Sequence, residues 1–149
     1  MQRGAVQTTG ASSAAGAWRS LCLFAGAWSI QGYSNFSVIE RATGRWIGRA
    51  GPWLPPGWPG PEIGWAFSRD VWGKGYATEA GIRCLEWAFE ELGWKEAVHI
   101  IHPDNNASVA VAKRIGATLR GPGAVAGGLI YVSTKDDWLR TQRSHHGQR

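Results

Sequence analysis

One short segment near the middle of the chain has the residue types that bind an anion. It reads Trp72-Gly-Lys-Gly-Tyr-Ala-Thr-Glu79, with two glycines directly ahead of an expected helix. Glycine leaves the backbone N–H groups accessible, and the first turn of a helix has N–H groups without intrahelical partners at the positive end of its dipole. Lys74 adds a positive charge and Thr78 a hydroxyl donor. The segment predicts a pyrophosphate site, although a glycine-rich helix start that binds nothing has the same composition.

Two common nucleotide-binding motifs do not fit this segment. A dinucleotide fingerprint requires a third small residue at the position of Thr78 and a strand that runs directly into the turn. Several residues separate the expected strand end at Phe67 from Gly73. The P-loop requires Ser or Thr after Gly-Lys, and Gly75 follows Lys74 here. The sequence therefore predicts an anion site that belongs to neither motif.

Histidine and cysteine positions do not predict a metal site. His99 and His102 lie three residues apart, so they point to opposite faces if both are in a strand. We expect structural roles for both histidines, and His102 is a less favoured candidate for a catalytic base. Cys22 and Cys84 match no zinc-binding spacing. We expect both thiols to be buried in a reducing cytosol, so we expect a cytoplasmic protein. The spacing of these residues leads us to expect no metal.

The composition limits the classes of protein to which this chain could belong. The chain has 149 residues, enough for one domain with a real core, and 44% of them are apolar. The net charge of +5 leaves an anionic partner open. These charges are scattered and no RNA-binding motif is present, which argues against nucleic acid. The longest apolar stretch, residues 21–28, is far shorter than the roughly 20 residues that cross a bilayer, so we expect no membrane partner.

Hydrophobic periodicity predicts a mixed α/β fold. Helices are expected at 17–30, 77–92 and 107–115, and strands at 36–40, 45–49, 62–67, 97–101, 117–120 and 129–135. The first two strands form a hairpin around Thr43-Gly44, whereas the alternation of strand and helix implies parallel neighbours, so the sheet is mixed. Residues 51–61, with five of the seven prolines, are expected to form a surface loop. We expect one domain at 17–140 between a flexible segment at 1–16 and a flexible tail at 141–149, with fraying already after Trp138.

Residues 34–138 resemble the GNAT N-acetyltransferase superfamily, in its RimJ/RimL-like branch. The superfamily signature is Gln or Arg, any two residues, Gly, any one residue, and then Gly or Ala. In this chain Gly75 and Ala77 match the signature, and Trp72 replaces its first residue, as is common in this branch. Thr78-Glu79-Ala80 also resembles the branch. A second match is His102-Pro-Asp-Asn-Asn-Ala-Ser108 after the fifth strand of the family fold. Two separate motifs with a strand between them make the resemblance specific.

The resemblance implies a GNAT-like acyl-CoA N-acyltransferase fold that binds acetyl-CoA as cosubstrate. The cofactor would lie where the strands at 62–67 and 97–101 diverge, and the acceptor would be a primary amine, either a protein N-terminus or a small molecule. The amine would attack the thioester directly, with a backbone amide stabilising the oxyanion. The residues that would bind the cofactor are Ala66 and Phe67 along the pantetheine arm, Trp72, Gly73, Lys74, Gly75, Tyr76, Ala77 and Thr78 at the pyrophosphate, and Asn105 on the opposite wall.

Two residues are candidates for proton transfer. Ser108 matches the family position that protonates the departing thiolate, although a serine there can also bond to its own helix backbone. Glu62 is the first candidate to assist deprotonation of the amine, because partial desolvation on the cofactor strand would raise its pKa. A surface ion pair is the alternative role for Glu62. Trp53 and Trp58 in the proline-rich loop are candidates to flank the acceptor.

The chain departs from the family pattern at its start. Family members usually begin with a strand and a helix that have no recognisable counterpart here, so we expect an N-terminally shortened fold. The strand at 36–40 would then be an open edge that allows a homodimer to form through strand pairing. The same departure leaves a second function open, an acetyl-CoA or CoA-binding module without turnover.

Overall fold

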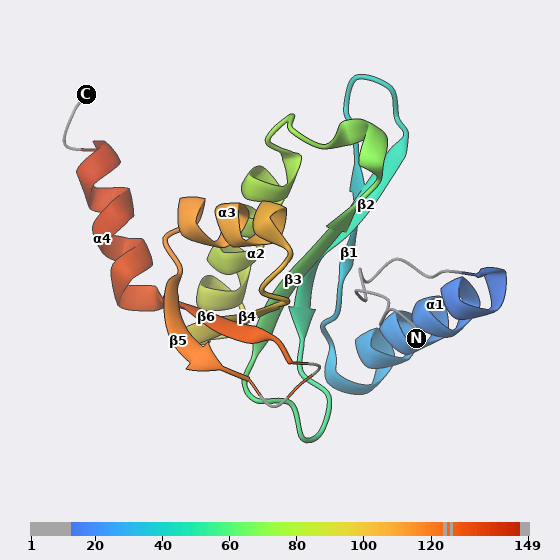
Figure 1. Ribbon diagram of the computed structural model, residues 1–149, viewed down its shortest axis with the longest axis horizontal. Coiled ribbons are helices and arrows are strands. Elements are labelled where there is room, and N and C mark those ends of the chain that lie inside the picture. Colours follow the sequence, from blue (N-terminus) through green and yellow to red (C-terminus); the bar gives the residue numbers. More distant parts are fainter. Residues whose placement is uncertain (1–12, 124, 126, 147–149) are drawn as a thin grey trace.

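The core of the protein is a six-stranded sheet with helices on both faces (Figure 1). The computed structural model describes residues 13–123, 125 and 127–146. The strands are β1 (Phe36–Ile39), β2 (Trp46–Trp53), β3 (Glu62–Phe67), β4 (Glu96–Ile101), β5 (Thr118–Pro122) and β6 (Leu129–Thr134). Their order in the sheet is β1-β2-β3-β4-β6-β5. Only β3 and β4 are parallel neighbours, so the mixed sheet is confirmed, and β1 lies at an edge of the described sheet, as predicted.

One face of the sheet packs against α2 (Tyr76–Glu90). The helix buries a stripe that includes Leu85, Ala88 and Phe89 against Ala50 and Ile63 of the sheet. This spacing matches the helical period that predicted the helix. Cys84 belongs to the same buried cluster, and burial raises the pKa of its thiol to about 12, so it is a packing residue as expected. Next along the chain, after β4, α3 (Asn106–Arg114) packs beside α2, and its buried Ala112 clusters with Ile101 and Tyr131 of the sheet.

Helix α1 (Ala14–Gln31) lies on the other side of β1 and β2 from α3 (Figure 1), and its Trp28 ring reaches Trp87 of α2 at 6.4 Å. Only part of its apolar stripe packs: the Phe24 ring meets Trp53 at 5.3 Å, and Trp28 meets Phe36 at 5.2 Å. Trp18, which we expected on the packed stripe, is 67% exposed. Cys22 is also exposed, which corrects the expectation of two buried thiols.

Helix α1 also begins earlier than the sequence indicated. Ser13 caps it by accepting a hydrogen bond from the Gly16 N–H at 3.1 Å, so residues 14–16 are helical rather than part of a flexible lead. The rest of the expected lead, residues 1–12, lies outside the described residues.

Strand β2 runs three residues into the segment that we expected to be loop. Gly51, Pro52 and Trp53 pair with β3, and Pro52 is fully buried opposite Ile63. A proline is tolerated here because the β1 ladder ends at the Phe36–Ala50 pair, so no strand partner faces the position of the missing N–H. The Asn35 amide donates to the Pro52 carbonyl at 3.2 Å instead. The proline-rich loop therefore begins after Trp53.

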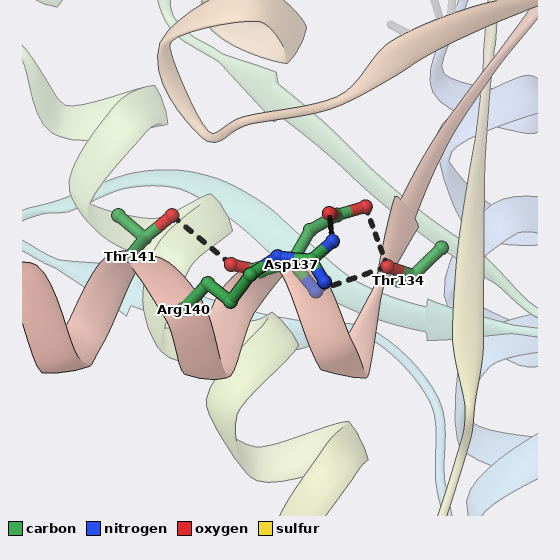
Figure 2. A network of polar contacts seen from close by, with 4 residues as sticks. All are labelled: Thr134, Asp137, Arg140 and Thr141. Atoms are coloured by element: carbon green, nitrogen blue, oxygen red, sulfur yellow. Dashed lines mark hydrogen bonds and ion pairs between the residues drawn. The ribbon is translucent and has the colours of Figure 1, made fainter.

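The polar segment after β6 is a helix, α4 (Lys135–His146), where we expected a frayed tail. Thr134 caps its start: the Thr134 hydroxyl accepts from the Asp137 N–H at 3.1 Å and donates to the Asp137 carboxylate at 2.6 Å (Figure 2). The Asp137 carboxylate also pairs with Arg140, and its carbonyl accepts from the Thr141 hydroxyl. The Thr-x-x-Asp spacing was the sequence signal for this helix. The structure describes no residue beyond His146.

Strands β3 and β4 diverge after a single paired position. Glu62 pairs with Val98, whose N–H donates to the Pro61 carbonyl at 2.8 Å, and no further pair follows. Beyond it, the ring of His99 bridges the gap, with Nδ1 2.7 Å from the Ile63 carbonyl and Nε2 3.0 Å from the Ser133 hydroxyl. A carbonyl only accepts, so Nδ1 carries the proton and Ser133 donates to Nε2. His99 is therefore a structural residue, as predicted.

We expect His99 to make stability depend on pH. Burial lowers its pKa from 6.5 to about 4, so the unfolded chain binds a proton that the folded protein does not over this range. Stability is therefore lost as pH falls from 6.5 towards 4, by about 3 kcal/mol for this group. Urea unfolding at several pH values should show a smaller acid loss for His99→Gln than for the wild type. The variant His102→Gln, at a partly exposed histidine, is the control. An equal acid loss in the wild type and His99→Gln would contradict the assignment.

Candidate active site

The loop before α2 presents backbone donors, as the sequence predicted. Gly73 and Gly75 have φ values of +76° and +84°, which favour glycine, and a Cβ at either position would point into open space. The first hydrogen bond at the start of α2 runs from Glu79 N to Gly75 O, and no side chain caps the helix. Within the described part of the chain, the N–H groups of residues 76–78 therefore have no partner. A pyrophosphate fits this arrangement of donors.

Two side-chain contacts fix this loop at its ends. The Trp72 indole N–H donates to the Phe67 carbonyl at the end of β3, at 3.0 Å. The Tyr76 hydroxyl donates to Glu40 at 2.6 Å, and Thr43 donates to the other oxygen of the same carboxylate. These two hydrogen bonds, first that from Thr43 and then that from Tyr76, lower the pKa of Glu40. Lys74 is exposed on the loop between these anchors.

The edge of β3 that faces β4 carries backbone groups without a strand partner. Ser68 N donates to Ile47 of β2, and an antiparallel ladder alternates, so the N–H and C=O groups of Ala66 also point to β2. Those of Ile63, Trp65 and Phe67 point towards the gap, as the bonds to the Ile63 and Phe67 carbonyls confirm. The alternation thus makes Trp65 and Phe67 the residues whose N–H groups could pair with a pantetheine arm, whereas Ala66 contributes its side chain.

Ser108 and Asn105 lie on the opposite wall, at the start of α3. The Asn105 carboxamide oxygen accepts from Ser108 N at 3.1 Å and caps the helix. The Ser108 hydroxyl accepts from the Trp65 indole N–H at 3.3 Å, across the gap between α3 and β3. An indole only donates, so the hydroxyl keeps its own proton for another acceptor. The Asn105 NH₂ group can likewise still donate. These contacts bring the second motif of the sequence against β3.

Glu62 lies at the point where β3 and β4 separate. Its carboxylate accepts from the Trp58 indole N–H at 2.7 Å and lies 3.5 Å from Ile100 N on β4. Burial raises the pKa of this carboxyl, against the opposing effects of the two hydrogen bonds and of Arg49. The expected upward pKa shift is therefore present in the structure. The carboxylate also takes the place of a strand partner for Ile100, a structural contact that the sequence did not indicate.

A pocket of about 620 Å³ lies between α1 and the sheet. Its walls include Phe24 and Trp28 of α1, and its floor includes Arg49 of β2 and the β3 residues Ala66 and Phe67. The pocket therefore reaches β3, the strand whose gap edge carries the unpaired backbone groups. Sequence reasoning missed Arg49 and its partner Asn35, although an arginine within an otherwise apolar strand segment was a signal that could have found Arg49.

None of the helices at 14–146 combines the length and apolar character required to cross a bilayer. No three His, Cys, Asp or Glu side chains in the described ranges come together as a metal site would require.

Comparison with known proteins agrees with the geometry of the loop and the diverging strands. Residues 2–118 match the model of the acetyltransferase (GNAT) domain family. The chain belongs to the GNAT acetyltransferase family. An acetyltransferase from Agrobacterium tumefaciens strain C58 is 32% identical, with a TM-score of 0.77 over 85% of this chain and 75% of that one. The GNAT fold predicted from the sequence is thereby confirmed.

Curated relatives match part of this chain. The protein YkkB of Bacillus subtilis is 37% identical over 87 residues, which are 57% of this chain and 51% of YkkB. The FsC-acetyl coenzyme A-N(2)-transacetylase of Aspergillus fumigatus is 35% identical over 92 residues, 55% of this chain and 39% of that protein. The chain thus spans about half or less of the length of these relatives.

We expect Gly75→Ala to weaken binding of CoA. A side chain at a φ of +84° costs about 1 kcal/mol or more, and relief of that strain would turn the loop donors away from the pyrophosphate. Calorimetric titration should show a dissociation constant higher by about fivefold to tenfold. Gly93→Ala is the matched control, because Gly93 has a φ of +68° beyond the far end of α2 and a Cβ there is also unobstructed. Equal affinities for Gly75→Ala and the wild type would contradict the assignment of this loop.

Proposed function

We propose that the protein transfers an acetyl group from acetyl-CoA to a primary amine by direct attack. The observation that carries this proposal is the divergence of β3 and β4 directly beside the uncapped start of α2. A diphosphate at residues 73–78 and a thioester arm along the β3 edge would then be bound by one continuous set of backbone donors. The match to the RimJ/RimL-like motifs supports a protein N-terminus as one acceptor class, and a small-molecule amine is the other. We also propose a cytoplasmic location, and a homodimer formed through the β1 edge.

The chemistry requires positioning and two proton transfers. The acceptor nitrogen forms a bond to the thioester carbon while the bond from that carbon to sulfur breaks. A backbone N–H of β3 on the gap side would donate to the carbonyl oxygen as negative charge develops there. Glu62 would accept the proton that the amine loses, directly or through water. Ser108 would donate to the departing sulfur, and solvent would restore the serine proton.

Thiol release from acetyl-CoA tests the proposal. The purified protein would be assayed with peptides of varied N-terminal residue, aminoglycosides and polyamines, and calorimetry would measure acetyl-CoA binding in parallel. Release of CoA that depends on an amine, with the acetylated amine detected by mass spectrometry, is the expected result. Tight cofactor binding without turnover across this panel, and with amino acids such as 4-aminobutyrate, would instead favour the CoA-binding module.

Ser108→Ala is expected to slow turnover without weakening cofactor binding. The variant removes a hydroxyl that can donate to the developing thiolate, so kcat should fall by about 10-fold to 100-fold. Trp65→Phe is the matched control, because it removes the indole N–H that Ser108 accepts and leaves the Ser108 hydroxyl in place. Steady-state kinetics should show a clearly smaller loss for Trp65→Phe. If both variants lose the same activity, Ser108 acts only through its contact with Trp65.

Glu62→Gln is expected to lower activity but not stability. A general base contributes about 10²-fold or more, and the acid limb of the kcat/KM profile should disappear with it. The pKa of Glu62 is higher in the folded protein than in the unfolded chain, so the folded protein keeps the carboxyl proton to a higher pH. Wild-type stability therefore falls as pH rises from the unfolded pKa through the folded pKa. The variant should lack this loss and unfold at an equal or higher temperature at pH 7. Glu96→Gln, at an exposed ion pair with Arg120, is the control. An unchanged pH–rate profile in Glu62→Gln would exclude Glu62 as the base.

A further inference from the structure

We infer that the acceptor amine carries a carboxylate, which Arg49 binds in the pocket between α1 and the sheet. This inference rests on the proposed function and narrows the class of substrate. Among the described residues that line the pocket, Arg49 has the only formal charge. The other walls are mainly aromatic and small side chains, from α1, β1, β2 and β3. A compact amine with an apolar body and an acidic end fits such a pocket, whereas a polyamine would meet a cation there.

Arg49 is held in a fixed orientation from two sides. Its guanidinium donates to the Asn35 carboxamide oxygen and lies over the Phe24 ring of α1, 4.5 Å from the centroid. Asn35 is itself anchored, because its side-chain NH₂ group donates to the Pro52 carbonyl and its main-chain carbonyl accepts from the Trp28 indole N–H. A guanidinium stacked on a ring presents its N–H groups at its edge, in the geometry that suits a carboxylate.

The sheet register places this cation beside the cofactor strand. Arg49 is the direct cross-strand partner of Ala66, so the two side chains are neighbours on the α1 face of the sheet. Glu62 lies on the same face four residues earlier in β3, and Arg49 is close enough to contribute to lowering its pKa. A molecule with one acidic and one amino group could therefore meet a cation and a proton acceptor at once. Burial also lowers the pKa of Arg49, a desolvation cost that a bound anion would offset.

A matched pair of acceptors tests the inference. 4-(Aminomethyl)benzoate and 4-(aminomethyl)benzylamine share the reacting amine and the aromatic ring, and differ in a carboxylate or an ammonium at the far end. 4-Aminobutyrate and 1,4-diaminobutane repeat the comparison without the ring. We expect kcat/KM to favour the carboxylate member of each pair by about tenfold or more in the wild type. The difference should lie mainly in KM, because the carboxylate is remote from the reacting atoms.

Three variants separate recognition of the carboxylate from support of the fold. Arg49→Gln should bring the ratio within each pair to about one or below, with the affinity for acetyl-CoA unchanged. Arg49→Lys, which keeps a cation, should retain the preference in part. Arg120→Gln, at an exposed ion pair on β5, should leave it unchanged. A purely structural Arg49 would instead lower the activity towards both members equally.

The outcomes distinguish this inference from the proposed function. Acetylation of the diamines as efficient as that of the amino acids, or a preference that survives in Arg49→Gln, would overturn the inference while leaving the acetyltransferase intact. Failure to acetylate any amine, despite binding of acetyl-CoA, would overturn the proposed function and the inference with it.

Discussion

The site depends on the side-chain hydrogen bonds that keep β3 and β4 apart. After the Glu62–Val98 pair, His99 takes the Ile63 carbonyl and the Glu62 carboxylate approaches Ile100 N. Buried backbone groups must be satisfied, and strands that simply separated would leave these two without partners. Because side chains supply the bonds, the divergence can be a stable part of the fold. The N–H groups of Trp65 and Phe67 then remain directed into a gap that a second backbone-like chain could fill.

Strand β3 divides the proposed chemistry between two faces and one edge. Its gap edge carries the backbone donors, its α2 face packs Ile63 and Trp65 into the core, and its α1 face presents Glu62 and Ala66. The period of two in a strand produces this division without any irregular backbone. A cofactor could therefore enter from the edge while an acceptor approaches from the α1 face. The two substrates would meet at one strand that the core holds rigid.

Local signals predicted most of the fold and the cofactor loop. The glycines at 73 and 75 and the apolar stripe of α2 act through nearby residues, so the sequence alone indicated the loop and the helix behind it. The contacts of His99, Arg49 and Asn35 depend on the register between strands, which no local pattern shows. The persistence of β2 through Pro52 depends on where β1 ends. Helix α4 is the exception, because a local signal, the Thr134-x-x-Asp137 cap, marks its start although we expected a frayed tail there.

Glu62 and Arg49 carry charges on the α1 face that are costly to desolvate, and this cost is an argument that the two residues have a function. Burial disfavours the ionised forms of both Glu62 and Arg49, and each partly offsets that cost for the other. An apolar pair of similar volume would avoid the desolvation penalty and is often at least as stable. The Trp58, Asn35 and Phe24 side chains are arranged around these two charges, so several parts of the chain hold them in position. Such a concentration of partners around a poorly solvated acid and base is typical of a site whose groups meet a substrate.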